Sequence, residues 1–257
     1  FEDGSKETAE VYVEGKIQGK PCRLLLDTGC SMTVLYFDAF SSHFKVIGSD
    51  ESSGILGRSD YDLISASSIE LGPIKKDHVI LSRAKKGGLD RNLLGMDILK
   101  NYCLHFFFQD RQVLVNPQLP DRKLLAHDLL LDRGSIPYVQ FECGKSKVSA
   151  VWDTGASVTL VDLGFVEKHS AMFKYVGREK GMDSTGSRME TPIYKMEPIL
   201  LGGQVFPAHK VVGVDLAHVN MATDIPMNFV LGYSTLSKAN WHFDFPRKKW
   251  AVLGMIN

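Results

Sequence analysis

The chain has 257 residues, of which 44% are hydrophobic and 23% are charged, as in a globular protein able to bury a core. Lysine and arginine together number 30, and aspartate and glutamate also number 30, so the formal net charge is zero. This balance argues against a binder of nucleic acid or of an anionic membrane surface. No apolar run approaches the roughly 18 residues needed to span a bilayer, so no membrane insertion is expected.

The first third of the chain reads as short strands separated by turns. Residues 11–13 and 23–26 have strand character, with Gly15, Gly19 and Pro21 between them. The second of these runs leads directly into Asp27-Thr28-Gly29. A glycine-flanked apolar tip follows at residues 53–57, and residues 79–81 form another candidate strand.

A second group of elements begins at the sequence Asn-Leu-Leu-Gly of residues 92–95. Residues 95–102 have a helical pattern, because Met96, Leu99 and Tyr102 fall on one face. Residues 103–108 and 113–115 are further candidate strands. Residues 118–134 then contain Pro120, several charges and three consecutive leucines, which indicates a linker that packs partly against a lobe.

The second half of the chain repeats the first. Residues 24–35 reappear as residues 150–161, so that Asp153-Thr154-Gly155 corresponds to Asp27-Thr28-Gly29. The Leu-Gly that ends residues 92–95 reappears at residues 231–232, and a helical stretch at 232–240 follows it. The repeat predicts an all-β protein of two lobes with pseudo-two-fold symmetry and one short helix per lobe. The expected boundaries are residues 1–117 and 135–257, joined by the linker 118–134.

These motifs resemble those of aspartic peptidases. An apolar strand, Asp-Thr-Gly, a small residue and Ser, followed some 70 residues later by Leu-Gly and a short helix, is similar to the retropepsin pattern. Retropepsins are homodimers with one Asp-Thr-Gly per subunit, whereas pepsin-like enzymes carry both on one chain. The resemblance implies a single-chain aspartic endopeptidase, with Asp27 and Asp153 as its catalytic pair and an extended polypeptide substrate bound in the interlobe cleft.

The chemistry of two aspartates supports the same interpretation. Thr28 and Thr154 can each hydrogen-bond across to the opposite loop. Gly29 and Gly155 lack a Cβ, which lets the two loops approach closely. Two carboxylates about 3 Å apart cannot both ionise, so one serves as the base and the other as the acid toward a bound water. This mechanism needs neither a metal nor a cofactor, and a monomer would hold both halves of the site.

The resemblance also implies mobile covers over the cleft. Residues Gly54, Ile55, Leu56 and Gly57 are similar to a retropepsin flap tip. Residues 181–187 occupy the matching place in the second half, where the sequence is more polar. The alternatives for this segment are an equivalent flap and a cover that is shorter or not equivalent to the first. Ser31 and Ser157 stand where retropepsins often have an aspartate that contacts the substrate backbone. An ordinary glycine-rich loop is the alternative for residues 53–57.

Several positions depart from the family pattern. Pepsin-like enzymes have Ser or Thr directly after each Gly, whereas this chain has Cys30 and Ala156. We interpret Cys30 as a small apolar filler, with a redox-sensitive thiol as the alternative. His105 and His242 occupy equivalent positions of the repeat, and we expect structural roles for both. The sequence contains no CxxC or HExxH pattern.

Two alternatives to the peptidase remain open from the sequence. One is a catalytically silent module that binds peptides, or regulates a partner, through the same cleft. The other is a structural domain whose Asp-Thr-Gly loops only tie the lobes together. The chain starts at Phe1 and not at Met, which fits either a processed mature chain or a trimmed one. A mature-type N-terminus would weakly favour an extracytoplasmic location, periplasmic or secreted.

Overall fold

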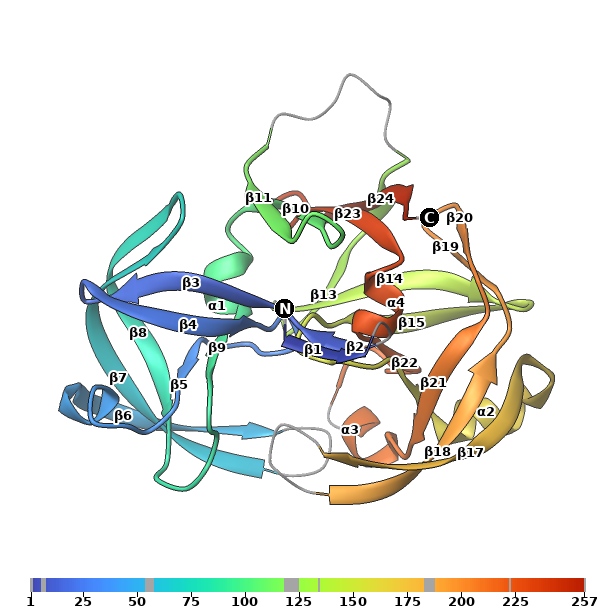
Figure 1. Cartoon of the computed structure of the whole chain (residues 1–257), viewed down its shortest axis with the longest axis horizontal. Helices are drawn as coiled ribbons and strands as arrows, with labels where there is room; N and C mark the ends of the chain where they lie inside the picture. Colours follow the sequence, from blue (N-terminus) through green and yellow to red (C-terminus); the bar gives the residue numbers. More distant parts are fainter. Residues whose placement is uncertain are drawn as a thin grey trace.

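A computed structural model shows a two-lobed protein built mostly of strands, which confirms the predicted all-β class. The structure describes residues 2–5, 8–53, 58–117, 125–133, 135–182, 188–221 and 223–256. Two lobes lie side by side, and a separate sheet bridges them (Figure 1). Among the described residues, no helix is long and apolar enough to cross a membrane.

The first lobe is a seven-stranded sheet that closes on itself through an extra pairing of β3 with β7. Its strand order is β3-β4-β9-β5-β8-β7-β6, and β4 runs parallel to β9. The predicted strand at residues 23–26 lies within β4. The strands are β3 (Tyr12–Ile17), β4 (Lys20–Leu26), β5 (Val34–Leu35), β6 (Lys45–Ser53), β7 (Arg58–Leu71), β8 (Ile74–Ala84) and β9 (Asn92–Leu94).

The second lobe has a ten-stranded sheet with the same central arrangement. β15 runs parallel to β22 and β16 runs parallel to β21, as β4 does to β9 and β5 to β8. The strands are β13 (Leu130–Asp132), β14 (Ile136–Cys143), β15 (Ser146–Trp152), β16 (Leu160–Asp162), β17 (Phe173–Met182), β18 (Arg188–Met196), β19 (Ile199–Leu201), β20 (Gln204–Phe206), β21 (His209–Val214) and β22 (Phe229–Leu231).

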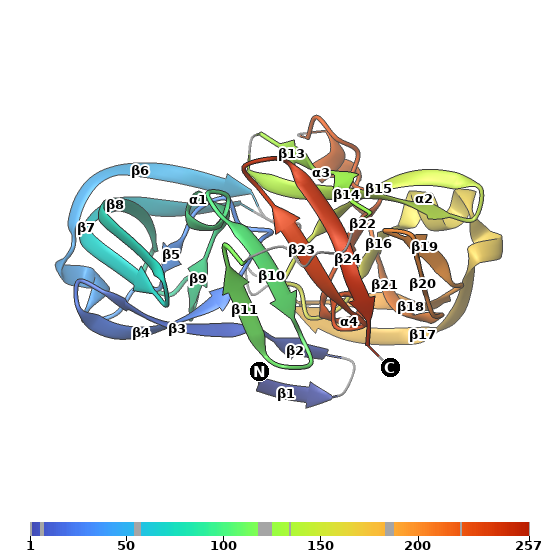
Figure 2. The same cartoon turned by 90° about the horizontal axis from the view of Figure 1, so that it is seen from above.

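The bridging sheet takes strands from both halves of the chain, in the order β11-β10-β23-β24-β12. β10 and β23 lie next to each other between the lobes (Figure 2). One face of this sheet packs on an aromatic core that includes the buried residues Phe106, Trp241 and Phe243, and Trp152 packs against all three. The strands are β10 (Cys103–Phe107), β11 (Gln112–Val115), β12 (His127–Asp128), β23 (Ala239–Asp244) and β24 (Lys249–Met255), and a separate hairpin is formed by β1 (Glu2–Ser5) and β2 (Thr8–Glu10).

The predicted linker 118–134 contributes strands over its described part, residues 125–133. β12 pairs with β24 of the bridging sheet, and β13 pairs with β14 of the second lobe. Leu129 between them is buried, and its backbone N–H donates to the Lys248 carbonyl at 2.9 Å. The linker therefore packs against its surroundings, and the predicted domain boundaries stay a prediction.

The helices differ from the expected ones in length and number. The predicted helices at 95–102 and 232–240 are only one turn long, because the chain must enter β10 and β23 within a few residues. The second lobe also contains two helices that the sequence analysis did not predict. The helices are α1 (Met96–Leu99), α2 (Leu163–Lys168), α3 (Ala217–Asn220) and α4 (Tyr233–Leu236), with 3₁₀ turns at η1 (Ser41–His43) and η2 (Ser170–Met172).

Candidate active site

The two Asp-Thr-Gly loops begin where a buried strand ends. Leu24 and Leu26 of β4 are buried in the core, and the loop starts at the next residue, Asp27. The Asp27 N–H donates to the Leu94 carbonyl at 3.0 Å, and the Asp153 N–H donates to the Leu231 carbonyl at the same distance. Each aspartate is thus held between two parallel strands of its own lobe.

Thr28 and Thr154 join the two loops by a symmetric set of hydrogen bonds. The Thr28 N–H donates to Thr154 Oγ1 at 3.1 Å, and the Thr154 N–H donates to Thr28 Oγ1 at 3.0 Å. The Thr28 hydroxyl donates to the Trp152 carbonyl and the Thr154 hydroxyl to the Leu26 carbonyl, both at 2.6 Å. Both threonines are buried, so water does not compete for these bonds. The network fixes one loop against the other, as the sequence analysis predicted.

The glycines bring each carboxyl group against the opposite loop. A Cβ on Gly29 would lie 2.6 Å from Asp153 Cγ, and a Cβ on Gly155 would lie 2.5 Å from Asp27 Cγ. Those separations are too short for any side chain, so both positions require glycine. The sequence-predicted pair, Asp27 and Asp153, is therefore brought together at the junction of the lobes.

The environment of the pair favours one shared proton. Burial, the charge of Asp153 and a hydrogen bond with Asp153 all raise the pKa of Asp27 well above the ordinary carboxyl value. Burial also raises the pKa of Asp153, but the hydrogen bonds that it accepts from Gly155 N–H and from Asp27 oppose that rise. The Gly155 N–H lies 2.8 Å from Asp153 Oδ1. Both carboxyl groups also accept backbone N–H groups that favour the charged form, so the arrangement favours a single proton shared by the pair.

The residue after each glycine gives no hydroxyl to the aspartates. The Cys30 thiol donates to the Met32 carbonyl at 3.0 Å, within its own loop. Burial and the nearby charge of Asp27 raise the pKa of this thiol, which keeps it protonated and poorly nucleophilic. Its geometry fits the predicted filler, while Ala156 offers only its backbone N–H to Asp153.

A buried threonine and an aspartate brace the first loop, and the sequence analysis missed both roles. Asp97 Oδ1 accepts from the Thr33 N–H and from the Thr33 hydroxyl, each at 2.8 Å. The Thr33 hydroxyl oxygen accepts from the Gly95 N–H at 3.1 Å. A Cβ on Gly95 would lie 2.4 Å from the Met32 carbonyl carbon, so the glycine permits this close approach.

The second loop is braced by hydroxyl groups instead of a carboxylate. The Thr159 N–H donates to Ser234 Oγ at 2.9 Å, and the Thr159 and Thr235 hydroxyls are 2.6 Å apart. Gly232 N–H donates to Thr159 Oγ1 at 3.2 Å. Thr33 and Thr159 occupy matching places in the repeated segment, and that match was the available signal for these bracing residues.

The predicted flap tip lies outside the described residues, because Gly54, Ile55, Leu56 and Gly57 all fall in the gap between β6 and β7. The strands on either side of the gap pair up to Ser53 and Arg58. In the second lobe β17 and β18 form a matching pair up to Met182 and Arg188, so the described part of that hairpin is also long. The two hairpins converge in the lower centre of Figure 1.

The two predicted substrate-contacting serines are placed differently. Ser31 is exposed, and its carbonyl accepts from the Asp97 N–H at 3.0 Å. Ser157 is half-buried. Both follow the Asp-Thr-Gly loops closely, and their contact with substrate stays a prediction.

Tyr61 of β7 is a site residue that the sequence analysis did not single out. It packs with Cys30 and Leu89 on a small buried cluster, and burial together with the charge of Asp27 raises its pKa. A cavity of about 260 Å³ lies beside it. The cavity is lined by Ser59, Asp60, Tyr61, Ala84, Lys85, Gly88 and Leu89.

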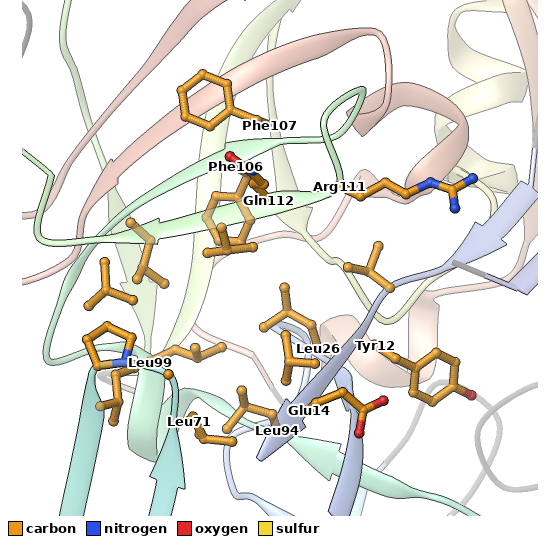
Figure 3. A pocket seen from close by; sticks show the side chains of 18 of the residues that line it. Tyr12, Glu14, Leu26, Leu71, Leu94, Leu99, Phe106, Phe107, Arg111 and Gln112 are labelled. Carbon is orange, nitrogen blue, oxygen red and sulfur yellow. The ribbon is translucent and has the colours of Figure 1, made fainter.

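A second cavity, of about 310 Å³, lies between the first lobe and the bridging sheet (Figure 3). Its walls are mainly apolar and include Leu26, Leu94 and Phe106, with Glu14 and Arg111 among the charged residues that line it. Neither Asp27 nor Asp153 lines this cavity. It is therefore separate from the paired aspartates.

Comparison with known protein families finds a match in the first lobe. Residues 13–98 match the family described as aspartyl protease, and this segment contains Asp27, the hairpin β6–β7 and Gly95. The match covers about a third of the chain and does not extend into the second lobe. A search of curated proteins finds no match. The first lobe is thus similar to aspartyl proteases, which supports peptide hydrolysis in general.

Proposed function

We propose that the chain is an aspartic endopeptidase whose catalytic residues are Asp27 and Asp153. The observation that carries the proposal is the placement of each carboxyl group against the glycine of the opposite loop, 2.5–2.6 Å from where a Cβ would stand. A pair of loops that merely tied the lobes together would need the threonine hydrogen bonds alone. It would not need two half-buried carboxyl groups that face each other. Placing them there costs free energy, because each group loses part of its hydration and their charges repel.

The pair supplies an acid and a base at the same pH. The charged member of the pair takes a proton from a water bound between the carboxyl groups. That water attacks the peptide carbonyl carbon, while the protonated member of the pair gives its proton to the carbonyl oxygen. The proton taken from the water then passes to the leaving amine, the peptide C–N bond breaks, and a hydroxyl proton of the intermediate returns to the aspartate that donated it. The rigid loops hold both groups in place, which lowers the reorganisation needed during the reaction.

The substrate is an extended polypeptide lying between the lobes. A β-hairpin from each lobe, β6–β7 and β17–β18, would close over it and exclude water. Extended peptides bind such surfaces through backbone hydrogen bonds, with side chains entering pockets on alternate sides. The cavity beside Tyr61 would take one of these side chains, because Tyr61 lies within reach of the Asp27 charge.

The two-lobed arrangement corresponds to two retropepsin-like units joined in one chain. The parallel pairs β4–β9 and β15–β22 each deliver one Asp-Thr-Gly loop, and the bridging sheet takes two antiparallel strands from each unit. On this proposal the additional residues of the second unit lie mainly between β21 and β22, where residues 215–228 contain α3, whereas only residues 85–91 separate β8 from β9.

Peptide-library digestion tests the proposal. We expect Asp27→Asn, Asp153→Asn and the double variant each to lose activity by about 10²–10⁴-fold or more, since either carboxyl group alone lacks its acid–base partner. The losses should be strongly non-additive because the two residues act as one unit. Asp110→Asn, at an exposed turn, is the matched control and should cleave as the wild type does.

Two outcomes would contradict the proposal. A single variant that keeps most of its activity would exclude the two-aspartate site. A wild-type protein that binds library peptides across the acidic and neutral range without cleaving them would identify a binding module instead.

A further inference from the structure

A cluster of three metal-binding side chains lies on the bridging sheet, outside the paired aspartates. It consists of Cys103 and His105 of β10 and His242 of β23, and their ligand atoms all lie within 4.8 Å of one another. His105 Nε2 is 2.8 Å from His242 Nδ1, and Cys103 Sγ is 3.8 Å from the same His242 nitrogen. The first two residues come from the first half of the chain and the third from the second half.

The sheet register explains why these side chains meet. His105 stands directly opposite His242 in the antiparallel pair of β10 and β23, and Cys103 stands opposite Asp244. Side chains alternate between the faces of a sheet, so these four share one face while Leu104 and Phe243 point into the aromatic core on the other. The ligands are 137 and 139 residues apart in sequence, which is why no short motif reveals them.

We propose that Cys103, His105 and His242 bind a zinc ion that links the two halves of the bridging sheet. Zinc favours cysteine sulfur at about 2.3 Å and histidine nitrogen at about 2.0–2.1 Å in a tetrahedral arrangement. Those bond lengths would separate the two nitrogens by about 3.3 Å, and the sulfur from a nitrogen by about 3.6 Å. The two observed separations from the His242 nitrogen, 2.8 and 3.8 Å, differ from these values by about half an ångström or less. The third pair, the Cys103 sulfur and a His105 nitrogen, lies within 4.8 Å and would have to close by up to about 1.2 Å when the ion binds.

The surroundings of the cluster suit a bound cation with three protein ligands. Both histidines are only 4% exposed, so the ion would be largely enclosed on their side. Cys103 is half-buried, so the cluster has an open side for entry of the ion and for a water as fourth ligand. Asp244 adds a negative charge nearby, although its carboxylate is already engaged by the Arg247 N–H at 3.0 Å and the Arg247 guanidinium at 3.3 Å.

The zinc site is independent of the proposed peptidase activity. A zinc ion here would join β10 to β23 across the boundary between the halves, so its effect would be on the stability of the interlobe junction. Zinc that binds the folded chain alone raises the melting temperature, by an amount that increases with the free zinc concentration. Without the metal, the side chains of the cluster are joined by the His105–His242 hydrogen bond and the 3.8 Å contact of the Cys103 sulfur with His242.

Cobalt(II) substitution of the full-length, EDTA-treated chain tests the site. We expect one Co²⁺ per chain with the visible bands of a tetrahedral ion and a thiolate-to-cobalt charge-transfer band. The charge-transfer band should disappear in Cys103→Ser and persist in Cys22→Ser, a cysteine of β4 outside the cluster. It should also persist in Asp27→Asn, which separates this site from any binding by the paired carboxylates.

Zinc itself provides the second measurement, because substitution of a buried histidine could unfold the chain. Added Zn²⁺ should raise the melting temperature of the wild type and of Cys22→Ser, but not that of Cys103→Ser. X-ray absorption at the zinc edge should show two nitrogen ligands and one sulfur ligand. Failure to bind Co²⁺ or Zn²⁺ at micromolar concentrations, or a cobalt spectrum unchanged in Cys103→Ser, would overturn the proposal.

Discussion

At the scale of single residues, the paired aspartates are a source of instability as well as the proposed source of activity. Burial raises the pKa of both carboxyl groups, which means that the fold disfavours their charged forms. In the unfolded chain both titrate in the ordinary carboxyl range. Their contribution to stability is therefore fully present below that range and is lost as the pH rises through the raised folded values.

This linkage predicts how Asp27→Asn changes stability with pH. The substitution removes one of the two facing carboxyl groups, so we expect a higher melting temperature than the wild type at neutral pH. The difference should shrink as the pH falls below the ordinary carboxyl range, where the wild-type pair is fully protonated. Thermal unfolding at several pH values measures this, with Asp110→Asn as the control that stays near the wild type throughout. A wild-type melting temperature above that of Asp27→Asn at neutral pH would contradict this prediction.

The residues after the glycines predict the pH dependence of cleavage. The Cys30 thiol donates its hydrogen bond to the Met32 carbonyl and Ala156 has no hydroxyl, so the aspartates lack two donors that would favour their charged forms. We expect a bell-shaped kcat/KM profile with its maximum at roughly pH 5 to 6.5, set by two coupled carboxyl groups. Ala156→Ser would add a hydrogen-bond donor worth about 0.5–1.5 kcal/mol. We expect this donor to shift the pH of maximum kcat/KM downward by up to about one unit.

The same measurement on Ala39→Ser, at an exposed position, controls for the added hydroxyl and should leave the profile in place. An Ala156→Ser profile that moves upward would contradict the assignment of the missing donors. So would a wild-type maximum in strongly acidic solution.

At the scale of elements, the two loops depend on each other through Thr28 and Thr154. Each hydroxyl accepts from a backbone N–H of the opposite loop and donates to a backbone carbonyl there, and all four backbone groups lie in the buried junction. Thr28→Val or Thr154→Val keeps the shape but leaves two buried backbone groups without a partner. We expect each to lower the free energy of unfolding by about 2–4 kcal/mol and kcat by about 100-fold.

A double-mutant cycle by denaturant unfolding measures this dependence. The double variant should lose less than the sum of the two single losses, because the second substitution acts on an already disrupted junction. Thr191→Val is the matched control, since its hydroxyl makes one bond of 3.3 Å within the second-lobe hairpin. Strictly additive losses would mean that the loops are fixed independently.

The sequence predicts the loops better than the elements that support them. Asp27, Thr28 and Gly29 carry their roles locally, since the strand, the turn and the missing Cβ all follow from neighbouring residues. The contact of Thr33 with Asp97 spans 64 residues and depends on how β9 passes behind the loop, which no local pattern specifies. For the same reason the histidine pair looked merely structural in the sequence.

The helices were predicted less well, because tertiary structure determines where they end and local sequence patterns do not. Residues 95–102 have a helical pattern, yet α1 ends at Leu99 because Cys103 must enter the bridging sheet. α2 was missed although Asp162 caps it, accepting from the Phe165 N–H at 3.1 Å. An aspartate before an apolar run is a recognised start signal, and the strand pattern around residue 161 obscured it.

At the scale of the whole molecule, both halves of the proposed active site belong to one chain. The bridging sheet joins β10 of the first half to β23 of the second, and its aromatic core continues to Trp152, one residue before Asp153. The facing surfaces of the two lobes are therefore covered by the chain itself. In a retropepsin the corresponding surfaces belong to two subunits and separate on dilution.

This arrangement predicts that cleavage does not require self-association. Specific activity against a peptide substrate should be constant as the enzyme is diluted to nanomolar concentrations, because no second chain contributes an aspartate. The Thr28→Val variant should show the same concentration independence at its lower activity, since its loss arises within one molecule. Light scattering over the same range should report a single species of 28.6 kDa. Activity that falls on dilution and returns on concentration would show that the functional unit contains more than one chain, and that the two loops seen here do not complete the site alone.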